Sequence, residues 1–505
     1  MSSPTRVFEA NDTNLCLQAS QSSSVGKRTT YKQVEPSNNA SGPAISNLHV
    51  LIPASQADPN LCKAIASANV LGYPSPTIIN WGLTFDDPAY VAGGSHLAKI
   101  NGTAQWLNSL DKTHDEDLVL MLDGYDAWIQ LRPQTLVDRF YDINRRANKR
   151  IDSEMNGQNA SQANISQKIV FGGQKRCWPW SPEDPPCYAV PNSSLPTDIY
   201  GPDTDKDVGD EQNPYIKYRQ RYLNSGVAMG TVGAMRKMFD QALAQAPQDA
   251  NFGSDQYIFS HIFGDQELYR EIARRDAGLT PRTGWNEVHI EEVRQKAAAT
   301  LDGTFEFGIG IDYAGEIGLN TVFAEDDTEW VKYSDGDQLR EAQDDLGVTE
   351  ENRLLRALPA DISKSTPPFQ VLSGVEKLPE DMQWEDVLLF TDVWTGVSPV
   401  VIHHNAHRDG MKILRETWWP KIWFQKHLGL LLEMYNRGPS SYVAVADDSA
   451  RGGREREYWP QEVWSGGDER GNIAKDGGPS GKWLKYQELC RAYDAEMFRD
   501  GRGWV

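Results

Sequence analysis

Asp123 and Asp126 are the residues whose type and spacing point most directly to chemistry. Asp123 directly follows residues 118–122, an apolar run that predicts a buried strand, and Asp126 lies three residues further on. In an open α/β sheet, ligands bind outside the carboxyl ends of the strands, where both carboxylates would lie. Carboxylate oxygens suit Mg²⁺ or Mn²⁺, and such an ion could hold a diphosphate. Aspartate and glycine are also common in β-turns, so these residues alone leave a metal site and a simple turn both open.

The segments that must position these aspartates alternate between strand-like and helix-like patterns. Short apolar or alternating runs predict strands at residues 48–53, 77–81, 118–122, 168–171, 222–230, 305–312 and 400–402. Apolar residues at helical spacing predict helices at residues 61–71, 94–110, 133–150, 232–246 and 254–263. This alternation predicts an α/β fold, with a mostly parallel sheet and helices on both faces.

Composition divides the chain into three parts. Residues 1–45 are polar and serine-rich, which predicts a disordered N-terminal segment. Residues 46–420 carry the alternating pattern and predict one α/β domain. Within it, residues 334–385 or thereabouts are charged and interrupted by proline, as an insertion would be.

Residues 421–505 predict a C-terminal extension of this domain. Apolar spacing predicts a helix at residues 422–436 and a final helix at 483–498 that would fold back onto the body. A glycine-rich, charged stretch at residues 438–481 separates the two predicted helices.

The overall charge restricts the partners of the chain. Its 505 residues include 50 basic and 71 acidic ones, for a net charge of −21, which opposes non-specific binding to nucleic acid or to an anionic membrane. An anionic substrate would therefore need a local cation or a bound metal ion. No stretch approaches the roughly 20 apolar residues that cross a bilayer, and the first residues lack the apolar core of a signal peptide. We therefore expect neither a nucleic-acid partner nor a membrane segment in this sequence.

Cysteines and glycosylation sequons bear on the compartment. Cys177 and Cys187 bracket a proline-rich loop that a disulfide could close in an oxidising environment, whereas Cys16, Cys62 and Cys490 have no evident partner. No two cysteines have CxxC spacing, which disfavours a structural zinc site. Asn-x-Ser/Thr sequons fit a lumenal or secreted protein, although they also recur by chance. These sequons begin at Asn11, Asn39, Asn101, Asn159, Asn164 and Asn192.

Several short motifs occur in one characteristic order. They are Gly93–Lys99, Asp123–Asp126, Arg176–Pro179, Leu223–Gly226, Ser254–Gln256, Ile311–Tyr313 and Val401–Asn405. In these motifs and their order, from about residue 48 to 419, the chain resembles the glycosyltransferase domain of the lysyl hydroxylase (procollagen-lysine glycosyltransferase) enzymes. That resemblance implies a GT-A type fold.

The resemblance implies a metal site. In such enzymes the two aspartates of a DxxD motif and the histidine that opens a late His-Gly-Asn-Gly motif hold Mn²⁺. Asp123, Asp126 and His403 are therefore the expected ligands here. This mixed oxygen and nitrogen set suits Mn²⁺, with Mg²⁺ as the alternative, and the ion would neutralise the departing diphosphate. Taken alone, His403 follows an apolar run, where a packed core histidine is the commoner interpretation.

The resemblance also implies residues that contact the nucleotide. The ring of Tyr125 is expected to stack on uracil, and Trp81, after the second strand, to supply another ring. Lys99 resembles a family lysine in a Gly-Gly-x-x-Lys segment, although two extra residues intervene. A further family lysine lies near the diphosphate, and Lys412 matches it better than Arg408. The competing interpretations are a core aromatic residue for Tyr125 and a solvated helix lysine for Lys99.

Five residues are expected around the sugars. Trp178 matches a Cys-Trp-Pro motif, and its flat ring suits a pyranose, although a structural role beside the disulfide would also explain it. Asn224, Ser225 and Gly226 place small polar groups at a strand end, where they would contact the donor sugar unless they form only a tight turn. Asp255 is the retained acid of an Asp-Asp-Gln motif and would bind donor or acceptor hydroxyls. Asp255, Trp178 and Asn224 are the candidate catalytic residues.

The chain also departs from the family pattern. Ser254 replaces the first acid of the Asp-Asp-Gln motif, which leaves the acceptor preference open. The late motif contains His404 and Ala406 in place of two glycines that permit close approach to phosphate, so a different local geometry is expected there. His407–Asp409 spells the HxD of iron and 2-oxoglutarate oxygenases. The only later histidine, His427, is too near in sequence to complete a facial triad, so the family's hydroxylase activity is not expected.

These features predict a Mn²⁺-dependent glycosyltransferase that moves a hexose, glucose or galactose, from a UDP-sugar to a glycan or glycoprotein acceptor with retention of configuration. A metal-dependent hydrolase or phosphodiesterase could use the same carboxylates and histidine. A non-catalytic nucleotide-sugar-binding protein is the third interpretation, because the two glycines are lost. The expected location is the ER or Golgi lumen or the exterior of the cell, with the cytoplasm as the alternative.

Overall fold

The structure of the protein is a computed structural model. It describes residues 16–17, 33–34, 43–247, 253–352, 357–370, 378–406, 414–437, 443–447, 455–460, 472–475 and 481–498. Most of the predicted disordered segment and much of the glycine-rich stretch lie outside these residues. Within the first segment, β1 (Cys16–Leu17) pairs with β2 (Gln33–Val34) in an antiparallel arrangement.

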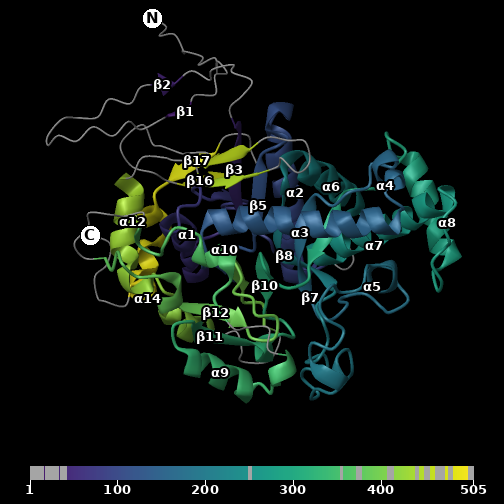
Figure 1. Cartoon of the computed structure of the whole chain (residues 1–505). Helices are drawn as coiled ribbons and strands as arrows, with labels where there is room; N and C mark the ends of the chain where they lie inside the picture. Colours follow the sequence, from purple (N-terminus) through teal and green to yellow (C-terminus); the bar gives the residue numbers. More distant parts are fainter. Residues whose placement is uncertain are drawn as a thin grey trace, which may run out of the picture.

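A large mixed sheet runs through the centre of the protein (Figure 1). Its first strands are β3 (Ala44–Pro53), β4 (Thr77–Ile79), β5 (Leu118–Leu122), β6 (Ala127–Ile129), β7 (Ile169–Gln174) and β8 (Tyr222–Thr231). The later ones are β9 (Ile309–Asp312), β10 (Gly318–Asn320) and β13 (Val401–His403). β3 is parallel to β4 and β5, and β10 is parallel to β7 and β13, whereas β8 runs antiparallel between β5 and β7. The predicted α/β class is confirmed, with a sheet that mixes parallel and antiparallel pairs.

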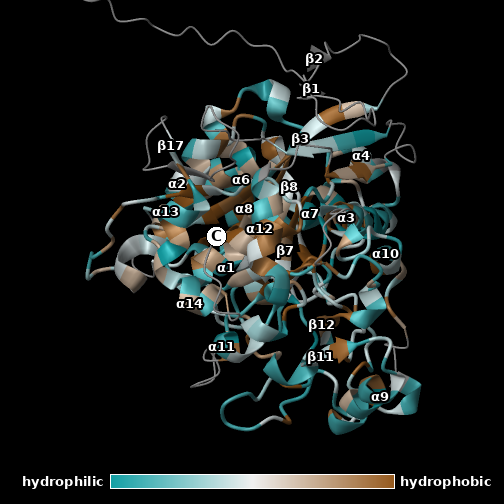
Figure 2. Cartoon of the chain, turned by 90° about the vertical axis from the view of Figure 1, so that its left-hand side faces the viewer, coloured by the Kyte–Doolittle hydropathy of each residue, from teal (hydrophilic) through white to brown (hydrophobic). Residues whose placement is uncertain are grey.

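Helices cover both faces of this sheet, as predicted. Neighbouring strand residues point to opposite faces, so Val50 and Leu120 pack with helices on one side while Leu51 and Met121 pack with helices on the other. The first face is covered by α1 (Pro59–Val70) and α3 (Pro133–Glu154), and α12 (Leu428–Arg437) packs against α1. The second face is covered by α2 (Ser95–Ser109), α6 (Val232–Gln245) and α7 (Asp255–Asp276), and α8 (Glu287–Ala299) packs against α7. Figure 2 shows apolar strands in the interior and many polar residues on the outer elements.

Local capping signals explain where several helices begin. The side chain of Asp58 accepts a hydrogen bond from Asn60 N ahead of α1, and Pro59 occupies the first helical turn. Thr231 and Ser254 cap α6 and α7 in the same way through their hydroxyl oxygens. Ser254, which stands where the resembled family has an acid, is therefore the N-cap of α7, and Asp255 is its first helical residue.

A small second sheet lies below the main one in Figure 1. β11 (Thr328–Lys332) and β12 (Leu388–Asp392) form an antiparallel pair, and the predicted insertion at 334–385 falls between them in sequence. This segment contains α9 (Gly336–Asp345) and the short α10 (Ala360–Ser363).

The C-terminal extension adds strands to the main sheet. β15 (Arg456–Pro460) is parallel to β3, and β16 (Asn472–Lys475) is parallel to β4. β14 (Ala444–Ala446) pairs with β15, and β17 (Lys482–Leu484) pairs with β16. Parts of the glycine-rich stretch, for which the sequence predicted no helix or strand, are thus strands that pair with β3 and β4.

The final predicted helix, 483–498, is wrong only at its start. Trp483 and Leu484 belong to β17, and the helical residues that follow form the short α13 (Tyr486–Cys490), a 3₁₀ turn (Arg491–Tyr493) and α14 (Asp494–Met497). The prediction that this segment folds back onto the body is confirmed, because a disulfide joins Cys490 to Cys62 in α1. The sequence had offered no partner for either cysteine. The predicted Cys177–Cys187 disulfide is present.

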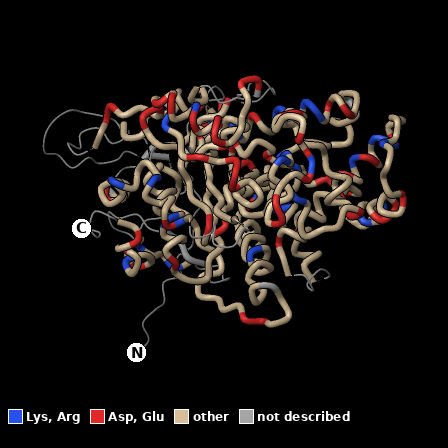
Figure 3. The backbone as a smooth tube through the Cα atoms, turned by 90° about the horizontal axis from the view of Figure 1, so that it is seen from below, with Lys and Arg blue, Asp and Glu red and all other residues tan. Residues whose placement is uncertain are grey.

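Two other predicted elements are shorter than expected. The strand predicted at 305–312 begins only at Ile309, because Gly308 has a φ of +76° that interrupts the extended backbone. The helix predicted from residue 422 begins at Leu428. No helix in the described part of the chain has the length and apolar character needed to cross a membrane. Figure 3 shows acidic and basic residues interspersed along the backbone.

Candidate metal centre

Three strands bring the predicted metal ligands together. Asp123 directly follows β5, and Asp126 directly precedes β6. β6 is antiparallel to β13, and this register sets Ala127 opposite His403, so Asp126 lies beside the end of β13. The backbone N–H of His404 donates to Asp126 O at 2.6 Å and fixes this contact. Residues 277 positions apart in sequence thus share one edge of the sheet.

Asp123, Asp126 and His403 form a compact set of ligand atoms. One atom from each lies within 4.8 Å of the other two. His403 Nε2 is 3.3 Å from Asp126 Oδ1 and 3.6 Å from Asp123 Oδ2. The histidine ring is buried, whereas the Asp123 and Asp126 side chains are 34% and 22% exposed, so the set is accessible from the carboxylate side. This arrangement can hold a divalent cation.

Asn320 sets the orientation of the histidine ring. Its Nδ2 donates to Gly173 O at 2.7 Å, which turns its Oδ1 toward His403 Nδ1 at 2.6 Å. Because Oδ1 can only accept, Nδ1 must carry a proton and donate. Nε2 then faces the two carboxylates without forming a hydrogen bond. A ring held through Nδ1–H with Nε2 free is the usual arrangement of a metal-binding histidine.

Lys99 links Asp123 to Asp255. Its ammonium group lies 2.6 Å from Asp123 Oδ1 and 2.9 Å from Asp255 Oδ2, and it also donates to Ser225 O at 2.8 Å. Burial favours a lower pKa for Lys99, but the two carboxylates outweigh burial and raise that pKa above its usual range. Burial alone would raise the pKa of the Asp255 carboxyl, but the charge and the hydrogen bond of Lys99 together outweigh burial and lower that pKa. Both groups are therefore charged, and Asp123 keeps Oδ2 for a cation.

Asn224 and Ser225 belong to a buried hydrogen-bond network. Asn224 Oδ1 accepts from Gly226 N at 3.0 Å, and its Nδ2 donates to Gln174 Oε1 at 2.9 Å. Ser225 N donates to Gln256 Oε1 at 3.4 Å. Asn224 and Ser225 are only 4% and 5% exposed. Their polar groups thus position β8 rather than extend from it toward a ligand.

The same network reaches Trp178. Gln256 Nε2 donates to Trp178 O at 3.0 Å, while the Trp178 side chain is 42% exposed. Its neighbour Trp180 stacks on Tyr257 in α7, with ring centroids 3.9 Å apart. The loop that the Cys177–Cys187 disulfide closes is thus anchored to α7, and the Trp178 side chain is partly exposed on this loop.

The residues expected beside the nucleotide are only partly assembled here. Tyr125 lies between the two aspartates, and its hydroxyl oxygen accepts hydrogen bonds from Ser55 N at 2.9 Å and Gln56 N at 3.2 Å. Trp81 is half-buried against the hydrophobic core. Within the described residues, it forms no hydrogen bond with Asp123, Asp126 or His403. Lys412 lies outside the described residues, as does Arg408.

His404 occupies the position of a glycine in the resembled motif. Its ring is buried against Trp128, with ring centroids 4.0 Å apart, and also contacts Trp418. Burial lowers the pKa of His404 well below its usual range, so the ring is neutral. The side chain therefore points into the core, and only its backbone contributes to the ligand edge.

No family model matches this chain, and no curated protein matches its sequence. A function for this protein is therefore inferred from Asp123, Asp126 and His403 and from the residues that surround them.

Three supporting residues of this centre were not singled out from the sequence. Gln256 belongs to the Ser254–Gln256 motif, but the sequence did not indicate that its side chain would bond to Ser225 N and Trp178 O. Gln174 ends β7 and Asn320 ends β10, each directly after apolar or glycine residues. A polar amide at a strand end is the only signal the sequence offers. This signal identifies a residue that supports the metal ligands only once the neighbouring strands in the sheet are known.

Proposed function

We propose that this protein is a Mn²⁺-dependent glycosyltransferase with a GT-A type fold. It would transfer a hexose, glucose or galactose, from a UDP-sugar to a glycan or glycoprotein acceptor. The observation that carries the proposal is the Asp123, Asp126 and His403 set, with the Nε2 atom of His403 turned toward two partly exposed carboxylates. Mixed carboxylate and imidazole ligands suit Mn²⁺.

The chain's own residues can prepare this site. Lys99 engages Asp123 Oδ1 and leaves Oδ2 toward His403, while Asn320 holds the imidazole ring. A bound Mn²⁺ would supply positive charge for the departing diphosphate. The ring of Tyr125, between the aspartates, is the proposed contact for uracil, and the exposed ring of Trp178 is the proposed surface for a sugar.

Asp255 bears on the stereochemistry of transfer. It is 5% exposed and paired with Lys99, so it is poorly placed to attack an anomeric carbon. This favours a single front-face step with retention over a double displacement. In that step the bond from the anomeric carbon to the diphosphate oxygen breaks while the acceptor oxygen bonds to the same face. The acceptor proton passes to the leaving diphosphate.

A thermal-shift screen of UDP-, GDP- and CMP-sugars, each with and without Mn²⁺, tests the proposal. We expect UDP-glucose or UDP-galactose to raise the melting temperature only when Mn²⁺ is present, and Asp126→Asn to abolish this shift. Absence of any nucleotide-dependent shift with Mn²⁺ would overturn the proposal.

Product analysis separates the competing functions. Transfer of the hexose to an added glycan mixture supports the glycosyltransferase. Release of the sugar or of UMP to water alone supports the hydrolase or phosphodiesterase. Binding without either product supports a non-catalytic nucleotide-sugar-binding protein.

A further inference from the structure

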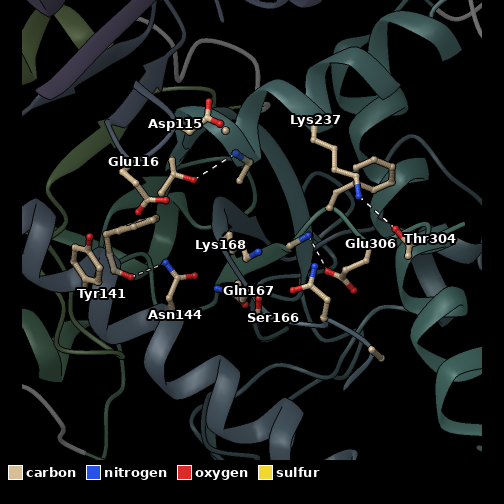
Figure 4. A pocket seen from close by; sticks show the side chains of 18 of the residues that line it. Asp115, Glu116, Tyr141, Asn144, Ser166, Gln167, Lys168, Lys237, Thr304 and Glu306 are labelled. Carbon is tan, nitrogen blue, oxygen red and sulfur yellow. Dashed lines mark hydrogen bonds between the residues drawn. The ribbon is translucent and has the colours of Figure 1, made fainter. Parts of the chain in front are cut away.

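Within the described residues, cavities also lie away from the candidate metal centre. One, of about 450 Å³, opens between α3, α6 and the segments that lead into β5 and β7. Figure 4 shows Lys237 turned toward Thr304, and Glu306 Oε1 accepts a hydrogen bond from Gly308 N at 2.8 Å. Glu306 also binds Arg270, at 2.7 Å. Charges of both signs line this cavity, and Lys237 and Glu306 are paired with neighbouring residues, so the lining favours no class of ligand.

A second cavity, of about 600 Å³, has a strongly unequal charge. It lies where α3, α7 and the short α5 (Pro185–Tyr188) meet the start of β8. Its charged lining residues are four arginines and one glutamate, which we call the arginine cavity. They are Arg150, Arg221, Arg274, Arg282 and Glu154. Its volume is within the range of about 300–1,000 Å³ that is typical of small-ligand sites.

Carboxylates compensate only part of this positive charge. Arg282 pairs with Glu154, and Arg150 Nε lies 3.9 Å from the same carboxylate. Behind the cavity wall, buried Glu271 Oε2 lies 3.4 Å from Arg274 Nε and 4.0 Å from Arg282 Nε. One exposed carboxylate is therefore shared between two guanidinium groups. In a chain with a net charge of −21, an open cavity with this excess of arginine is a local exception.

Arg221 is the arginine without a carboxylate partner. It donates to Val190 O at 2.8 Å and to Pro191 O at 3.3 Å, and it forms no ion pair within the described residues. These two carbonyls belong to the segment that lines the cavity. The guanidinium group is thus held in place by neutral acceptors, which leaves its charge for a ligand. Arginine is the preferred residue for bidentate contacts to carboxylate and sulfate or phosphate groups.

The remaining wall of the arginine cavity suits a sugar ring. Trp285 lies beside Arg282, whose guanidinium carbon is 5.3 Å from the ring centroid, and Tyr188 contacts Trp285 edge-on at 6.2 Å. Asn192 and Ser193, which follow in the lining, provide amide and hydroxyl groups. Aromatic faces for apolar ring surfaces, together with neutral polar groups, complement a pyranose.

We propose that the arginine cavity binds an anionic sugar, a pyranose that carries a carboxylate or sulfate group. The guanidinium group of Arg221 would contact the anion, and Trp285 would contact the ring. This site is separate from the Asp123, Asp126 and His403 set and requires no metal ion, so the proposal does not depend on the proposed glycosyltransferase activity.

Calorimetry in metal-free buffer at low salt tests the proposal with three probes. They are a glucuronate-containing disaccharide, a sulfated disaccharide and the neutral parent disaccharide. We expect at least one charged disaccharide to bind about tenfold or more tightly than the neutral one, as a charge-assisted contact would provide. The charged probe that binds more tightly shows whether the cavity prefers a carboxylate or a sulfate group. Equal binding of all three probes, or binding of none, would overturn the proposal.

Matched arginine variants locate the binding. Arg221→Gln removes a charge without leaving a carboxylate unpaired and should weaken the charged disaccharide about tenfold. Arg145→Gln, on the exposed face of α3 where the side chain is 63% exposed, changes the net charge equally and should leave affinity unchanged. Arg150→Gln, at the cavity rim, provides a second variant if Arg221→Gln does not fold. Equal weakening by Arg145→Gln would assign the effect to overall charge and contradict the proposed site.

Discussion

Gly226 lies directly against the imidazole ring of His403. A Cβ atom built on Gly226 would stand 1.9 Å from His403 Cε1 and 2.5 Å from both ring nitrogens. The carbonyl of Gly226 also accepts a hydrogen bond from Asp123 N at 2.8 Å. One glycine on β8 thus gives the histidine its space and holds the backbone of the first aspartate. Any side chain at this position would move a ligand.

Gly226→Ala is therefore expected to impair metal binding. The added methyl group must displace the His403 ring, which should weaken Mn²⁺ binding about 10–100-fold and destabilise the fold by about 1–3 kcal/mol. Titration of the free Mn²⁺ signal by electron paramagnetic resonance measures the affinity, and urea unfolding measures the stability. Gly336→Ala is the control, because nothing lies within 4 Å of a Cβ at that position. Unchanged Mn²⁺ affinity in Gly226→Ala would contradict the role assigned to His403.

Lys99→Gln should destabilise the protein by removing the cation between two carboxylates. Asp255 is buried, and an unpaired buried charge costs about 3–5 kcal/mol. The double variant Lys99→Gln with Asp255→Asn should recover part of that loss, because no unpaired buried carboxylate remains at position 255. Urea unfolding of the single and double variants measures both effects. Lys237→Gln, which breaks an exposed ion pair with Asp302, should change stability by less than about 1 kcal/mol.

Loss of the Cys62–Cys490 disulfide should be more costly than loss of the Cys177–Cys187 disulfide. The first joins residues 428 positions apart and the second joins residues 10 apart. A longer loop retains more conformational entropy in the unfolded chain, so Cys490→Ala should lower stability by about 2–4 kcal/mol and Cys187→Ala by less. Denaturant unfolding without reductant measures the difference. Equal stability of Cys490→Ala and the parent would show that this bond does not constrain the chain.

Asp392 should make stability depend on pH. Burial and then the charge of Asp327 raise the pKa of Asp392 to about 7. The folded protein therefore holds this proton more tightly than the unfolded chain, and the contribution of Asp392 to stability falls as the pH rises from about 4 to about 7. The full difference is at most about 4 kcal/mol.

Asp392→Asn removes this titration while keeping Oδ1, which accepts hydrogen bonds from Trp394 N and Thr395 N. The variant should equal its parent in stability near pH 4 and exceed it near pH 8. Urea unfolding across this range checks the difference between the two proteins. Asp337→Asn, with a side chain that is 95% exposed, is the control and should show no pH-dependent gain. A constant difference between Asp392→Asn and its parent would contradict the raised pKa of this carboxyl.

The sequence by itself determined the local features of this protein. The apolar run at 118–122 predicted β5, and the DxxD spacing placed Asp123 and Asp126 at its end. Apolar spacing likewise predicted α1, α3 and α6 closely, because burial of one helix face depends on residues near in sequence.

Only the tertiary structure decided which distant residues meet. The order of strands places β13 between β10 and β6, and this order brings Asn320, His403 and Asp126 together. The same cause explains the Cys62–Cys490 disulfide and the late start of the final predicted helix, whose first residues pair with β16 instead. Strand pairing is stabilised by partners anywhere in the chain, and a local pattern carries no record of which partner will be adjacent.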